Sequence, residues 1–131
     1  MTRTYFFVLA VAFASVAQAA DKPAHLFIQS GQSNMQGMNP KLGFEPETAK
    51  LFPDANVAYI KVSRGGQPIR LWVTEWNEIA KKAGLDSTSA GTKYYEPILS
   101  EFEKLLTKHP NPASVTFCWM QGERDAKENL S

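Results

Sequence analysis

Three apolar runs in the sequence predict three β-strands, at residues 25–30, 56–62 and 114–120. The first run is short and apolar, the second alternates roughly between apolar and polar residues, and each of the three stops at a glycine-bearing segment. Short apolar runs that end at glycine are typical of buried strands followed by loops. The three strands are therefore each expected to lead into a loop.

A longer stretch, residues 94–108, predicts an amphipathic helix, which the Pro-Asn-Pro sequence at residues 110–112 ends. Its apolar residues recur at spacings of three and four: Tyr95, Ile98, Leu99, Phe102, Leu105 and Leu106. Long connections separate the three strands, and a crossover between parallel strands needs about a dozen residues or more. We therefore expect an α/β fold with a parallel sheet.

Length and composition limit the chain to one globular domain. A chain of 131 residues has no room for two domains, and 44% hydrophobic with 21% charged residues is typical of a folded protein. The formal net charge of +1 lacks the basic excess of a nucleic-acid-binding protein, so no nucleic-acid partner is expected. The single cysteine, Cys118, cannot form an internal disulfide and is predicted to be a small buried hydrophobe.

The N-terminus has the pattern of a secretory signal peptide, which we place at residues 1–19. Arg3 precedes an apolar segment at residues 5–17, and Ala17-Gln18-Ala19 offers small residues for cleavage. The apolar segment is shorter than the ~20 residues of a membrane-spanning helix. We therefore expect residues 20–131 to form a domain that is secreted or periplasmic, of bacterial origin, without stable membrane anchoring.

Three loops are expected at one edge of the sheet, because the carboxyl ends of parallel strands meet there and ligands bind beyond them. They are Gly-Gln-Ser-Asn-Met at residues 31–35, Gly65-Gly66, and Gln-Gly-Glu-Arg-Asp at residues 121–125. Together they supply a hydroxyl, backbone N–H donors, an amide and two carboxylates. That set is typical of an acyl-transfer site, with a nucleophile, oxyanion donors and an acid.

The same segments resemble a known family. Residues 28–35, the Gly65-Gly66 loop leading to Trp72, and residues 119–126 are similar to the three early sequence blocks of the sialate O-acetylesterase-like domain. This is carbohydrate esterase family 6 of the SGNH hydrolases. The resemblance implies a flavodoxin-like three-layer sandwich with a parallel sheet, incomplete here at the carboxyl end. It also implies removal of acetyl groups from carbohydrates such as sialic acid or xylan-type glycans, with no metal or organic cofactor.

Carried over by position, the resemblance makes Ser33 the nucleophile of an acyl-enzyme mechanism. The N–H of Ser33 and that of Gly65 or Gly66 resemble the oxyanion donors, and the Gln121 side chain is a candidate third donor. The non-catalytic alternatives are that Ser33 caps a helix and that the glycine pair serves only a turn.

Glu123 resembles the acid of the Gln-Gly-Glu block, either as a member of the triad or as an organiser of the loop and substrate. Gln32 and Asn34 are placed with the oxyanion and substrate-binding residues. Arg124 departs from the family, where a small residue is expected. The alternative for Glu123 and Asp125 is that both are ordinary solvated carboxylates.

Two other functions stay open at this point. A non-catalytic carbohydrate-binding module would use Trp72 and Trp76 for stacking on sugars. A lipase or thioesterase on the same fold would need an apolar acyl channel. An acetyl optimum in acyl-chain preference would favour the sugar esterase.

The general base is missing from this pattern. Serine usually needs a histidine as proton acceptor, and the chain has only His25 and His109. His25 begins the first strand, about 20 Å from Ser33 at about 3.3 Å per residue, and His109 precedes the amino end of the third strand. In the resembled family the catalytic histidine comes from a late block. We therefore expect the chain to be truncated before that histidine and to hydrolyse acetyl esters poorly or not at all.

Overall fold

The computed structural model describes residues 22–85 and 93–127, so the predicted signal peptide lies outside the described residues. The helices and strands follow one another as β1 (Ala24–Gly31), α1 (Ser33–Gly37), η1 (Pro40–Leu42), α2 (Phe44–Leu51), β2 (Asn56–Ser63), η2 (Ile69–Trp72), α3 (Trp76–Ala83), α4 (Tyr95–Lys108), β3 (Ser114–Met120) and α5 (Glu123–Lys127).

The strands form a parallel sheet with the order β2-β1-β3. Gly31, at the carboxyl end of β1, lies opposite Ser63 of β2 and Met120 of β3. This order is the beginning of the flavodoxin-like arrangement, in which the first strand lies between the second and the third. The predicted α/β class and parallel sheet are confirmed, and the three strands and the helix at residues 94–108 lie where the sequence pattern places them.

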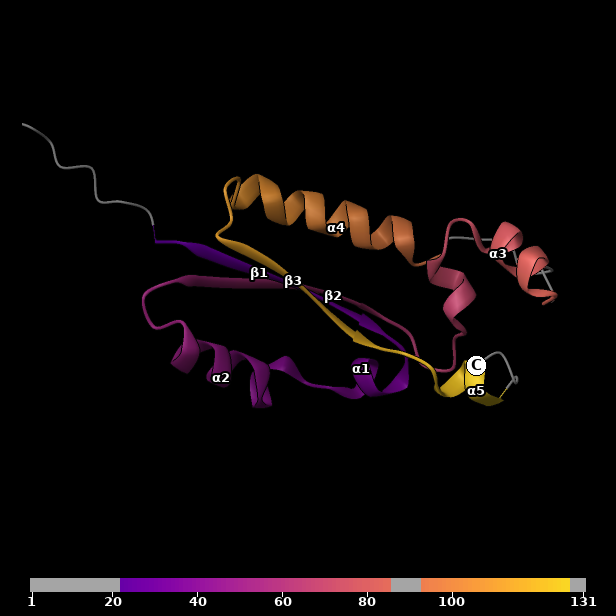
Figure 1. Cartoon of the computed structure of the whole chain (residues 1–131). Helices are drawn as coiled ribbons and strands as arrows, with labels where there is room; N and C mark the ends of the chain where they lie inside the picture. The colour runs from indigo at the N-terminus through magenta and orange to yellow at the C-terminus, as the bar shows by residue number, and fades with distance from the viewer. Residues whose placement is uncertain (1–21, 86–92, 128–131) are drawn as a thin grey trace, which may run out of the picture.

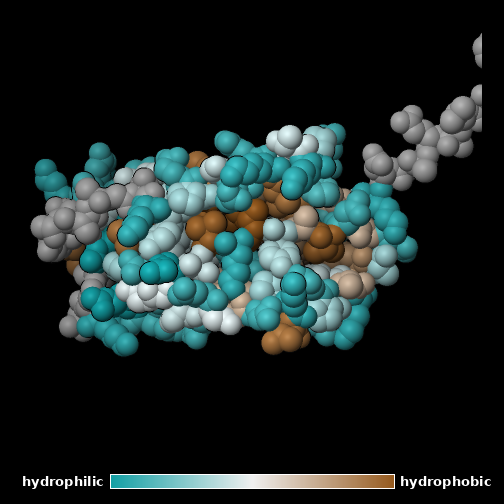
Figure 2. Space-filling view, turned by 180° about the vertical axis from the view of Figure 1, so that it is seen from behind, coloured by the Kyte–Doolittle hydropathy of each residue, from teal (hydrophilic) through white to brown (hydrophobic). Residues whose placement is uncertain are grey.

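Helices cover both faces of the sheet. In Figure 1, α4 lies on one side of the strands, and α1 and α2 lie on the other. Leu26 of β1 is fully buried, and Ile98 of α4 is buried as well. On the α2 side, the ring of Phe27 packs edge-on against Phe44, with 4.9 Å between centroids. Seen from behind, hydrophobic residues form a band between two hydrophilic layers (Figure 2).

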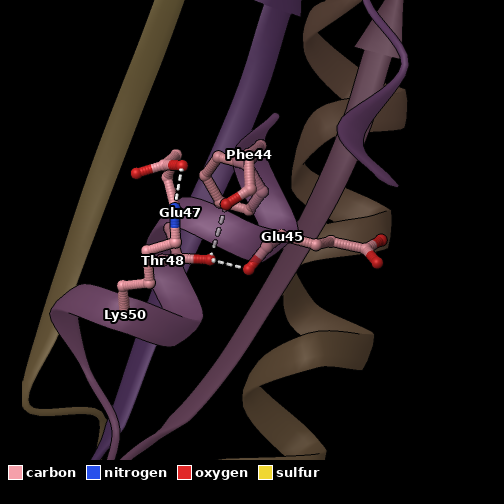
Figure 3. Close-up of polar contacts among 5 residues, drawn as sticks. All are labelled: Phe44, Glu45, Glu47, Thr48 and Lys50. Atoms are coloured by element: carbon pink, nitrogen blue, oxygen red, sulfur yellow. Dashed lines mark hydrogen bonds and ion pairs between the residues drawn. The ribbon is translucent and has the colours of Figure 1, made fainter. Parts of the chain in front are cut away.

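Polar contacts stabilise α2 internally, and one of them connects it to the sheet. The Thr48 hydroxyl donates to the carbonyl oxygens of Phe44 at 2.8 Å and Glu45 at 3.1 Å, and Lys50 pairs with Glu47 at 2.7 Å (Figure 3). The Tyr59 hydroxyl of β2 donates to the Glu45 carboxylate at 2.6 Å. This bond joins α2 to the strand that it leads into.

The sequence pattern did not predict α1 or α5, and both bear on function. Each has five residues, which is too short to show a helical repeat of apolar positions. Ser33 and Glu123, expected in loops, are instead the first residues of these helices. Both side chains are thereby attached to regular backbone directly after a strand.

Strand β3 is the more exposed edge of the sheet. Val115 and Phe117 are 48% and 53% exposed, and β3 pairs only with β1 among the described residues. Cys118 is half-buried rather than buried as predicted. Partial burial raises the pKa of the Cys118 thiol. Within residues 22–85 and 93–127, no helix has the length and apolar character needed to span a membrane.

Candidate active site

The segments that follow the three strands meet at one edge of the sheet and bring Ser33 and Glu123 together. Ser33 follows β1 and Glu123 follows β3, 90 positions later in the chain. The Ser33 hydroxyl donates a hydrogen bond to Oε2 of Glu123 at 2.7 Å. The parallel order places both residues at the carboxyl edge, where ligands bind in such sheets.

Gly31 allows the first and third segments to approach each other. Its φ of +137° is one that residues with a side chain rarely adopt, and a Cβ atom there would lie 2.0 Å from the carbonyl oxygen of Met120. The next residue, Gln32, donates its backbone N–H to the same oxygen at 2.8 Å. Glycine at position 31 therefore sets the distance between the end of β3 and the start of α1.

Gln32 links α1 to α5. Its side chain is 2% exposed. With the amide oxygen turned toward α5, it accepts from the backbone N–H groups of Glu123 at 2.7 Å and Arg124 at 3.2 Å. These are first-turn N–H groups that have no partner within their own helix. Gln32 thus caps α5 and holds the residue that carries the carboxylate next to Ser33.

The Glu123 carboxylate accepts a second hydrogen bond from Asn34. The Asn34 side-chain amide donates to Oε1, while Ser33 donates to Oε2. Two side chains of α1 therefore hold one carboxylate of α5. This joins three of the predicted site residues in one cluster.

The glycine pair after β2 also lies in this cluster. A Cβ atom on Gly65 would be 3.6 Å from both Cα and Cβ of Ser33, and the Gly65 N–H donates to Oε1 of Gln36 at 2.6 Å. Gly66 has a φ of +68°. A pocket of about 100 Å³ is lined by Gln32, Ser33, Gly66, Glu123, Arg124 and Lys127.

The side chain of Gln121, a predicted site residue, points toward the second segment and not toward Ser33. Its side-chain amide donates to the carbonyl oxygen of Gln67 at 3.0 Å, and its oxygen accepts from the N–H of Gly122. Gln121 therefore connects the third segment to the second. It does not line the pocket at Ser33.

Two residues that the sequence interpretation did not assign to the site support it. Gln36 accepts a hydrogen bond from the Gly65 N–H. It lies one helical turn after Ser33, but because α1 was not predicted, nothing in the sequence pointed to it. Asp125, weighed as a solvated carboxylate, is instead 6% exposed, and its two oxygens accept from the N–H of Ile69 at 2.9 and 3.1 Å. Nothing in the sequence distinguished it from the charged residues around it.

The tryptophans that a carbohydrate-binding module would expose are buried. Trp72 and Trp76 are each 7% exposed. The Trp72 ring stacks on Tyr94 with 4.4 Å between centroids, and its N–H donates to the buried hydroxyl of Ser30 at 3.0 Å. These side chains are part of the core.

Both histidines lie at the amino edge of the sheet. Nδ1 of His25 is 2.8 Å from the hydroxyl of Ser114, and its ring packs 4.2 Å from that of Phe52. His109 follows α4 and lines a pocket with Lys22 and Asn56. Six residues of strand, about 20 Å, separate His25 from the carboxyl edge. In the described part of the chain, no three His, Cys, Asp or Glu residues are grouped as a metal site.

Comparison with known families agrees with this arrangement. The family described as carbohydrate esterase, sialic acid-specific acetylesterase matches residues 8–131. Neither the curated proteins nor the solved structures gave a match to the chain. The family match includes β1, β2 and β3 with the segments that follow them. The chain therefore belongs to the carbohydrate esterase family of sialic acid-specific acetylesterases.

Proposed function

We propose that the protein is a serine esterase that removes O-acetyl groups from carbohydrates through an acyl-enzyme at Ser33. The observation that carries this proposal is the 2.7 Å hydrogen bond between the Ser33 hydroxyl and Glu123, at the edge of the sheet where Gly65 adjoins Ser33. The family supports the class of reaction.

In the proposed reaction, Ser33 Oγ attacks the carbonyl carbon of the acetyl ester while a base takes its proton. The oxygen of the tetrahedral intermediate gains negative charge, and the N–H groups of Ser33 and Gly65 stabilise it. Collapse of the intermediate expels the sugar hydroxyl, which receives the proton. Water then attacks acetyl-Ser33 and releases acetate. Glu123 orients the Ser33 hydroxyl through the bond described above.

Neither histidine of the chain can serve as the base of this mechanism. His25 lies about 20 Å from Ser33 along β1, too far for proton transfer, and His109 lies at the same amino edge of the sheet. We propose that a histidine outside the 131 residues completes the site, as the resemblance to the family implies. In the structure, the Ser33 hydroxyl donates its hydrogen bond to Glu123.

The pockets support an acetyl group rather than a long acyl chain. The pocket at Ser33 has about 100 Å³, and apart from Gly66 its lining residues are polar or charged. A more apolar pocket of about 300 Å³ lies between α4 and β3, lined by Ile69, Trp72, Val73, Tyr95, Ile98, Phe117 and Trp119. The two share no lining residue. The lipase or thioesterase alternative lacks an acyl channel at Ser33 in the described part of the chain.

The test is Ser33→Ala in the protein expressed from its complete reading frame. We expect kcat on an O-acetylated sugar to fall by about 10³-fold or more, because the nucleophile is lost, while the melting temperature changes little. Ser100→Ala, at an exposed position of α4, is the matched control and should keep full activity. A fluorophosphonate should label the wild type and the control but not Ser33→Ala. Retained activity in Ser33→Ala would remove this residue from the mechanism.

A further inference from the structure

The oxyanion donor proposed at Gly65 already has an acceptor in the unliganded protein. The Gly65 N–H donates to Oε1 of Gln36 at 2.6 Å. That oxygen belongs to a neutral carboxamide, so it presents a carbonyl to the N–H group that the acetyl carbonyl would use. The Gln36 side chain therefore occupies the place of the substrate oxygen on one of the two backbone donors.

The fold holds Gln36 in this position. Ser33 and Gln36 are three residues apart on α1, so their side chains lie on the same side of the helix. The Lys61 ammonium donates to the backbone carbonyl of Gln36 at 3.1 Å and to that of Met38. A cation at the carboxyl end of α1 satisfies carbonyl groups that lack helical partners. Lys61 thus fixes the turn of α1 that carries Gln36.

The Gln36 amide oxygen and the Ser33 side chain both lie close to Gly65. A Cβ atom on Gly65 would be 2.9 Å from Oε1 of Gln36 and 3.6 Å from Cβ of Ser33. The amide oxygen therefore lies beside the backbone N–H to which the proposed reaction assigns the acetyl oxygen. An incoming carbonyl oxygen has to replace the amide oxygen at the Gly65 N–H.

We propose that Gln36 is a positioning residue that acts as a latch: its side-chain carbonyl holds the Gly65 loop against Ser33 in the resting enzyme and is displaced by the acetyl carbonyl. This inference rests on the proposed function, since it assigns the Gly65 N–H to the oxyanion. A neutral amide suits the role. A carboxylate in its place would bind the Gly65 N–H more strongly and resist displacement by the acetyl carbonyl.

The latch predicts that removing Gln36 improves binding, whereas a purely structural residue would only impair it. Gln36→Ala and Gln36→Met both lack the acceptor, and methionine keeps the length of the side chain. In the complete enzyme, we expect either variant to lower KM about fivefold with little change in kcat, because one net hydrogen bond no longer has to be exchanged. Gln36→Glu should raise KM, because a carboxylate binds the Gly65 N–H more strongly than an amide.

A second measurement does not depend on turnover. Acetate, the product of the reaction, is titrated into ¹⁵N-labelled full-length protein, and the amide signals of Ser33 and Gly65 are followed by NMR. Gln36→Met should bind acetate about fivefold more tightly than the wild type. Gln67→Ala is the matched control, because Gln67 also contacts Gly65 but donates to its carbonyl, at 3.4 Å. Its acetate affinity should equal that of the wild type.

The outcomes separate the latch from the proposed function. If acetate shifts both amide signals but binds equally well to the wild type and Gln36→Met, the latch is disproved and the proposed site stands. If both Gln36→Ala and Gln36→Met raise KM, Gln36 is a structural residue only. If acetate moves neither amide signal in any variant, the Gly65 N–H is not an oxyanion donor, and both proposals fail at this point.

Discussion

Individual residues decide how closely the segments of the site approach one another. Gln32 caps α5, and Asp125 binds the N–H of Ile69, so each joins two segments that are distant in the sequence. Glycines contribute because the absence of a side chain lets two backbone segments come close together. The strongest case is Gly31, which lies between the end of β3 and the start of α1.

Gly31→Ala should prevent stable folding. Its methyl group would meet the Met120 carbonyl oxygen at 2.0 Å, in a backbone conformation with φ of +137°. Strain of this kind costs about 1–3 kcal/mol before the clash is added, and the sum should exceed about 4 kcal/mol. The control, Gly37→Ala, has no atom within 4 Å of the added methyl group and should leave stability almost unchanged. Urea denaturation followed by circular dichroism measures both; equal midpoints would contradict the close approach.

At the level of secondary-structure elements, the exposed edge strand β3 leads to a prediction about self-association. Residues 114–120 include no charged side chain. Edge strands are usually protected from pairing with other chains by lysine, proline or a bulge. We expect the isolated chain to self-associate through β3. Phe117→Lys, at a position that is 53% exposed, should reduce light scattering at a given concentration.

Leu42→Lys is the control for that experiment. Leu42 is 82% exposed on η1, so the variant adds the same charge away from the sheet. Equal reductions by both substitutions would assign the effect to net charge and contradict a role of the β3 edge.

The contact between α2 and β2 should give a pH dependence at alkaline pH. The hydrogen bond to Glu45, followed by partial burial, raises the pKa of Tyr59 above its ordinary value of 10.0. A raised pKa in the folded state means that this contact stabilises the fold fully below about pH 10 and loses its effect as the pH rises through the folded-state pKa. Tyr59→Phe should therefore be less stable than the wild type at pH 8, and the difference should shrink above pH 10.

Urea denaturation across this pH range measures the effect, with Tyr95→Phe, which alters an exposed tyrosine, as the control. A stability difference between wild type and Tyr59→Phe that stays constant from pH 8 to pH 11 would show that ionisation of Tyr59 has no part in it.

The complete site depends on the arrangement of the entire sheet, because each strand supplies one part of it. The described chain provides a nucleophile, backbone donors and a carboxylate, but both of its histidines lie at the opposite edge. Because the proposed histidine lies outside these residues, we expect residues 1–131 to hydrolyse p-nitrophenyl acetate far more slowly than the longer protein proposed above. Removal of a triad member leaves an acceleration of about 10³ to 10⁴-fold over water. Turnover equal to that of the complete enzyme would show that Glu123 alone serves as the base.

Part of this architecture could be predicted from local patterns. The strands at residues 25–30, 56–62 and 114–120 agree with β1, β2 and β3 to within one residue at each end. The helices α1 and α5 could not be predicted, because five residues show no periodicity. The burial of Asp125 and Trp72 also depends on neighbours that are distant in the sequence. Such contacts leave no local pattern.

The amino-acid sequence alone was sufficient for the α/β class, the glycine-bearing segments and Ser33 as the candidate nucleophile, since these depend on neighbouring residues and on short motifs. Only the folded chain places Ser33 against Glu123, 90 positions away, and Gln36 against Gly65, 29 positions away. The physical reason is that both contacts depend on strand order and register. The order β2-β1-β3 brings three distant segments to one edge, and no single segment specifies that order.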